Sequence, residues 1–69
     1  MSPGAPSPPR RRASGEVIVE FVGAGGFLRC TAVDVDTATE ASAIGPTSAG
    51  RAALERIALG KLKRALAAL

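Results

Sequence analysis

Apolar and polar residues alternate in the first part of the chain that follows a proline-rich N-terminal segment. Between residues 16 and 22, the side chains of Val17, Val19 and Phe21 fall on one face, which is wholly apolar. The other face mixes glutamate with Ile18 and Val22. Alternation with a period of two is typical of a β-strand. Residues 16–22 are therefore expected to form a strand with one buried face.

Two further strands are expected, joined by turns. The glycine-rich residues 23–26 favour a tight reversal, because glycine adopts positive φ angles without strain. A second strand is expected over residues 27–33 and a third over residues 39–44, with an Asp- and Thr-rich turn between them. Gly45 and Pro46 are expected to end the sheet. The core-facing residues of the two strands are expected to be Leu28, Cys30, Ala32, Thr39, Ala41 and Ala43.

The remainder of the chain has the spacing of a helix. It is expected to begin between residues 47 and 50, where Thr, Ser and Gly are acceptable N-caps, and to continue to the C-terminus. Leu59 and Leu66 lie toward the flank of its apolar stripe, which they widen to about half the circumference. The residues expected to cover the sheet are Leu54, Ile57, Ala58, Leu62, Ala65 and Leu69.

These elements predict an α+β fold. Strands that are adjacent in sequence and joined by short turns form an antiparallel meander. The prediction is a three-stranded β-meander followed by one C-terminal α-helix on one sheet face, as a single βββα domain over residues 15–69. Residues 1–14 contain four of the five prolines and no large apolar residue after Met1, so they are expected to be a disordered tail.

A domain of about 55 residues can hide little apolar surface, and its core is marginal. Ile18 and Val22 remain on the outer sheet face, and Leu59 and Leu66 remain on the helix flank. We take these four residues as a candidate interface. The leading hypothesis is therefore a small interaction or accessory module, either a homodimer or bound to a larger protein.

The net charge of +3 is supplied by Arg10, Arg11 and Arg12, because the rest of the chain has six basic and six acidic residues. This triplet and the basic end of the helix suggest a second hypothesis, weak and salt-sensitive binding to nucleic acid or another anionic surface. Aromatic support for that hypothesis is limited to Phe21 and Phe27. The candidate anion contacts are Arg10, Arg11, Arg12, Lys61, Lys63 and Arg64.

The composition gives little support for catalysis. With one cysteine and no histidine, the chain predicts no disulfide framework, no metal site and no cofactor, and a cytoplasmic location is expected. No apolar run approaches the roughly 20 residues that span a bilayer. Cys30 is interpreted as a small core residue and is the one nucleophile worth testing. The segment from Gly45 to Ala52 imitates a phosphate loop, but Arg51 stands where that loop has lysine.

Three segments, GEVIVEFVGAGGFLRCTAVD, TEASAIGP and LERIALGKL, resemble in order and spacing a family of short bacterial proteins defined only as a domain of unknown function. The resemblance extends from Gly15 to about Leu66. It supports the βββα fold and implies no activity. The chain departs from the family pattern at Ala38, where a turn glycine is expected, and at Arg64, where an aromatic residue is usual.

Overall fold

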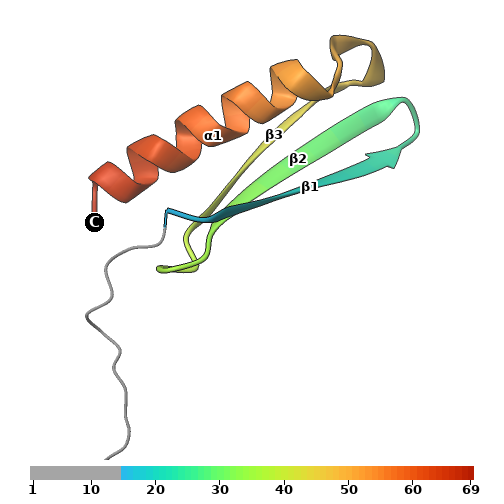
Figure 1. The fold of residues 1–69 in the computed structure, drawn as a ribbon. Coiled ribbons are helices and arrows are strands. Elements are labelled where there is room, and N and C mark those ends of the chain that lie inside the picture. Colours follow the sequence, from blue (N-terminus) through green and yellow to red (C-terminus); the bar gives the residue numbers. More distant parts are fainter. Residues whose placement is uncertain (1–14) are drawn as a thin grey trace, which may run out of the picture.

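The computed structural model describes residues 15–69, which form a three-stranded antiparallel sheet followed by one helix (Figure 1). The strand order is β1-β2-β3, so the predicted α+β class and βββα order are confirmed. The tail predicted over residues 1–14 lies outside the described residues. The elements are β1 (Val17–Ala24), β2 (Phe27–Asp34), β3 (Glu40–Pro46), the short 3-10 helix η1 (Thr47–Ala49) and α1 (Arg51–Ala67).

The first hairpin has a two-residue turn. Gly25 and Gly26 have φ angles of +57° and +83°, the combination that a type I′ turn requires and that glycine adopts most readily. Ala24 pairs with Phe27 at the end of the ladder. The reversal is therefore shorter than the predicted turn over residues 23–26, and Gly23 belongs to β1.

The third strand continues past the position where it was expected to end. Pro46 pairs with Phe27 as the last residue of β3, so the strand runs two residues beyond the predicted end at residue 44 and the sheet stops at Pro46 itself. In the β2–β3 register, the N–H of Asp34 donates to the Thr39 carbonyl, and the N–H of Thr47 donates to the Gly26 carbonyl. Odd-numbered residues of β3 therefore bond to β2, and the backbone of residue 46 points away from it. A proline at this edge position costs no ladder hydrogen bond.

Small side chains form much of the contact between sheet and helix. Cys30, Ala32 and Ala43 are buried on the sheet, and Ala58 is buried on α1. Leu28, Leu54 and Leu62 complete the buried cluster. Because the small residues allow close approach, α1 lies directly on β2 and β3 and makes few contacts with β1. The inner-face residues of β1 are consequently only half-buried.

The predicted helical stripe is rotated from the observed one. Leu54, Ala58 and Leu62 face the sheet as expected, but Ile57 is 48% exposed and Leu69, beyond the end of α1, is 80% exposed. Leu59 and Leu66 pack against the core instead. Ala58, which is fully buried, lies between Leu54 and Leu62 at the middle of the observed stripe.

The turn between β2 and β3 is organised by Asp34. The buried carboxylate of Asp34 accepts hydrogen bonds from the backbone N–H of Thr37 at 3.0 Å and from the Thr37 hydroxyl at 2.8 Å. The Asp34 carbonyl accepts the N–H of Ala38 at 2.8 Å. Ala38 has a φ of +61°, which is strained for a residue with a Cβ atom. The backbone at Ala38, where the family pattern predicts a turn glycine, therefore has a conformation that favours glycine.

Replacing Ala38 with glycine should raise the free energy of unfolding by about 0.5–1 kcal/mol, because the relief of left-handed strain exceeds the added chain entropy. Urea unfolding followed by circular dichroism measures this change. The opposite substitution, Gly25→Ala at a φ of +57°, is the matched control and should destabilise the domain. Equal stability of Ala38→Gly and the natural chain would contradict the strain argument.

Leu62→Ala should lower the free energy of unfolding by about 2–4 kcal/mol, because it opens a cavity between α1 and the sheet. Ile57→Ala removes a half-exposed side chain from the same helix and should cost about 1 kcal/mol or less. Both values come from urea titrations of the two variants. A loss for Ile57→Ala as large as that for Leu62→Ala would mean that Ile57 is also buried against the sheet.

Candidate interaction surface

The outer face of the sheet carries an apolar cluster near the first hairpin, which we call the hairpin patch. It consists of Val22, Ala24, Phe27, Arg29 and Ile44. The register places Val22, Arg29 and Ile44 side by side on three strands. Val22 is 60% exposed, Phe27 59% and Ile44 67%. Apolar side chains of this size are thus held on a rigid sheet surface without a cover from the described residues.

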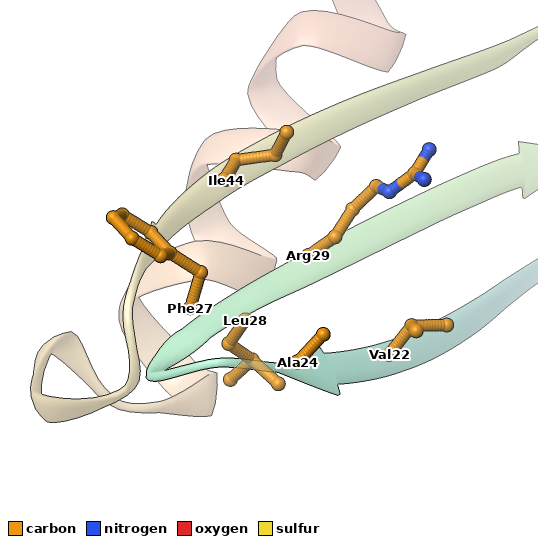
Figure 2. Close-up of a pocket in the computed structure, with 6 residues that line it drawn as sticks. All are labelled: Val22, Ala24, Phe27, Leu28, Arg29 and Ile44. Atoms are coloured by element: carbon orange, nitrogen blue, oxygen red, sulfur yellow. The ribbon is translucent and has the colours of Figure 1, made fainter.

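The hairpin patch is shallow and contains one charge. Its residues line a hollow of about 170 Å³ together with Leu28, which belongs to the core (Figure 2). Figure 2 shows the Arg29 side chain extending from β2, with Val22 and Ile44 on the strands to either side. Within residues 15–69 the Arg29 guanidinium forms no hydrogen bond or ion pair. The cation is therefore available to an external acceptor.

The four predicted interface residues lie on two separate surfaces. Ile18 and Val22 are both exposed on the outer face, where a polar row that contains Glu20 and Thr31 separates them. Leu59 and Leu66 lie on the opposite side of the sheet. They line a second hollow of about 280 Å³ between α1 and β1, which we call the helix groove. Its other lining residues are Val17, Leu62 and Lys63.

Sequence reasoning missed the two most prominent members of the hairpin patch. Phe27 has the same strand parity as Arg29, and Ile44 has the same parity as Glu40 and Ser42, so alternation alone could have placed both outside. Bringing them together required the register between β2 and β3, in which Ile44 pairs with Arg29 and Pro46 pairs with Phe27. That register is set by the turn between β2 and β3.

The predicted basic cluster at the helix end is divided. Lys61 reaches over β3 and donates a hydrogen bond from Nζ to the Ser42 carbonyl at 3.0 Å. Lys63 borders the helix groove on the other flank of α1. Arg64 is exposed in the last turn, where its charge complements the helix dipole. Arg10, Arg11 and Arg12 lie outside the described residues.

Arg51 has a packing role at the start of α1. Its guanidinium lies over the ring of Phe21, 5.1 Å from the ring centroid. A cation in this position is attracted by the electron-rich face of the ring. The residue that stands in place of a phosphate-loop lysine is therefore directed toward the sheet, and it joins the start of the helix to the inner face of β1.

Cys30 is fully buried in the core. Burial of the thiol and, secondarily, the negative charge of Glu55 raise the pKa of Cys30 above its ordinary value. Both effects favour the neutral thiol, which is a poor nucleophile. Among residues 15–69 no group of three Cys, Asp or Glu side chains is arranged to hold a metal ion. In the same range no helix has the length and apolarity needed to cross a membrane.

Comparison with known proteins identifies a family but no activity. The profile of a domain of unknown function, DUF6898, matches residues 14–69. The chain belongs to the DUF6898 family. The resemblance to a domain of unknown function is thus confirmed, and the match covers all the elements of the DUF6898 fold described above. No curated protein and no solved structure matches the chain.

Native Cys30 should react with a thiol reagent about 100-fold more slowly than the same thiol in denaturant, because the core must open first at a free-energy cost of about 3 kcal/mol. Absorbance of the released chromophore gives both rates. Equal labelling rates in native and unfolded protein would show that the thiol is accessible.

The raised pKa of Cys30 also predicts a contribution to the free energy of unfolding that depends on pH. This contribution is fully present below about pH 8.5, the ordinary thiol pKa, and is lost as pH rises through the pKa of the folded protein. Cys30→Ala should reduce that loss.

Proposed function

We propose that this DUF6898 member is a small non-catalytic interaction or accessory module that works as a homo-oligomer or bound to a larger protein. The observation that carries the proposal is the hairpin patch, where Phe27 and Ile44 are more than half exposed on a domain with a very small core. Large apolar side chains gathered on one rigid surface usually mark a protein contact.

The composition of the hairpin patch also supports a protein contact. Aromatic residues and arginine are enriched where proteins bind one another, and both are present here as Phe27 and Arg29. The three strands hold these side chains in fixed positions, so binding would require little ordering of the sheet. The hollow at their centre is shallow, as suits an inserted side chain better than an enclosed small molecule.

A non-catalytic role is favoured by the position of the reactive groups. Cys30, the only nucleophile selected from the sequence, faces the core, and the two hollows are lined mainly by aliphatic side chains. The proposal includes a cytoplasmic location, which is supported by the presence of a single cysteine with no intrachain partner for a disulfide.

The alternative of nucleic-acid binding is less well supported by the helix end. Lys61 is bonded to the Ser42 carbonyl and Lys63 faces the other flank, so the two ammonium groups do not form one surface for a phosphate backbone. Binding of that kind would depend on Arg10–Arg12. We therefore favour the protein-interaction role.

A photoreactive phenylalanine analogue in place of Phe27 should give a discrete crosslinked product in the cells that produce this protein. The same analogue at Arg56, an exposed helix position, is the control and should give none. Adding Ile44→Ser should abolish the product, while the free energy of unfolding changes by no more than about 1 kcal/mol because Ile44 is exposed. Equal labelling from Phe27 and Arg56, or a product that survives Ile44→Ser, would contradict the proposal.

A further inference from the structure

The two edges of the sheet differ in how well their backbone groups are protected. Val35 donates its N–H to the Glu16 carbonyl at 3.1 Å, one pair beyond Val17 and Asp34, which end the β1–β2 register. In an antiparallel ladder, this bond assigns even-numbered residues of β1 to the hydrogen-bonded pairs with β2. The N–H and C=O groups of the odd-numbered residues therefore point outward from the sheet. These residues are Val17, Val19, Phe21 and Gly23.

On the other edge, the outward residues of β3 are even-numbered, and two of them are already blocked. The Ser42 carbonyl accepts the Lys61 ammonium, and Pro46 has no N–H to donate. By contrast, β1 contains neither lysine nor proline among its eight residues, and these are two of the residues that protect an edge strand. The open edge of the described sheet is thus β1.

We propose that the β1 edge pairs antiparallel with the β1 edge of a second copy of this chain, which joins two sheets into one of six strands. This inference rests on the proposed interaction role and names its partner. An edge strand offers alternating donors and acceptors, and a two-fold axis perpendicular to the sheet presents the same groups in complementary order. Both α1 helices then lie on one face of the continuous sheet.

The charges on β1 select the register of this pairing. The backbone groups of odd-numbered residues point outward, so hydrogen-bonded pairs between the two copies must join odd-numbered residues. Near the middle of the strand, this condition is met when the two-fold axis passes through Val19, Glu20 or Phe21. With the axis at Glu20, the two Glu20 carboxylates would lie directly opposite each other, which is destabilising. With the axis at Val19, Glu20 would face the second copy's Ile18, and the second copy would bring no cation close to Glu20.

With the axis at Phe21, Glu20 lies opposite Val22 of the second copy. Val22 pairs with Arg29, so Glu20 and the second copy's Arg29 lie about two strand spacings, or roughly 10 Å, apart at Cα. Side chains of this length can meet over an intervening valine. Within residues 15–69 neither the Glu20 nor the Arg29 side chain forms a hydrogen bond or ion pair. The Phe21 register therefore adds an opposite charge from the second copy to each of these side chains, twice per dimer.

Charge reversal tests this register in the full chain. Glu20→Arg and Arg29→Glu should each raise the dimer Kd about tenfold, because two attractive contacts become repulsive. An equimolar mixture of the two variants should recover the Kd of the natural chain, since one copy then carries two positive and the other two negative charges. Analytical ultracentrifugation at low salt measures all four samples, and circular dichroism confirms that these exposed substitutions leave the fold intact.

A change within one chain cannot produce recovery on mixing, so the mixture isolates contact between copies. A natural chain that is monomeric at every concentration would overturn the proposal. A dimer whose Kd is unchanged by both reversals, or a mixture that fails to recover, would overturn it as well.

A backbone substitution tests the edge directly. The chain is short enough for chemical synthesis, and an N-methyl group at Phe21 removes an outward donor while it keeps the side chain and every bond to β2. N-methylation at Ile44, an outward position of β3, is the matched control. Only the change at Phe21 should abolish the dimer. Equal effects at both positions, or a dimer that survives methylation of Phe21, would overturn the edge pairing.

The two proposals fail in different ways. If the natural chain is monomeric while the Phe27 crosslink still forms, the second copy is the wrong partner and the interaction role stands. If a dimer persists in both reversals and after N-methylation, the copies do not pair through the β1 edge, and the interaction role again stands. If the chain is monomeric and Phe27 gives no specific product, both proposals are wrong.

Discussion

Close packing of one helix on two strands of a three-stranded sheet determines most of this structure. Cys30, Ala32, Ala43 and Ala58 are all buried at that contact, and their small size lets the helix backbone approach the sheet. The close approach centres α1 over β2 and β3 and leaves β1 without a full cover. The half-buried face of β1 and the helix groove are consequences of where a helix can lie when its contact residues are this small.

The sheet faces could be predicted because alternation with a period of two assigns a side chain to a face regardless of its exact partner. Val19 and Cys30 are on the predicted sides for this reason. The rotation of α1 could not be predicted in the same way. Apolar residues surround much of that helix. Which of Ile57 and Leu59 is the more buried therefore depended on a contact with the sheet that the helix sequence does not encode.

The candidate site was predicted in part. Ile18 and Val22 were correctly placed on the outer face, while Phe27 and Ile44 were missed because their proximity depends on the register between β2 and β3. The contact between Lys61 and Ser42 joins residues 19 positions apart, and no local pattern in the chain indicates it. Membership of the DUF6898 family supplies no substrate or partner, so the functional argument depends on exposed side chains and backbone geometry.

The hydrogen bond from Lys61 to the Ser42 carbonyl also limits how far the sheet can grow. A sheet with two open edges can add copies on both sides, and head-to-tail addition through unlike edges continues without closing. In the proposed dimer the β1 edges are used, and the Lys61 bond and Pro46 both hinder addition to the β3 edge. An ammonium group that reaches from the helix to a strand thus helps to separate a finite assembly from a filament. Acetylation of that lysine would remove its charge and weaken this barrier to polymerisation.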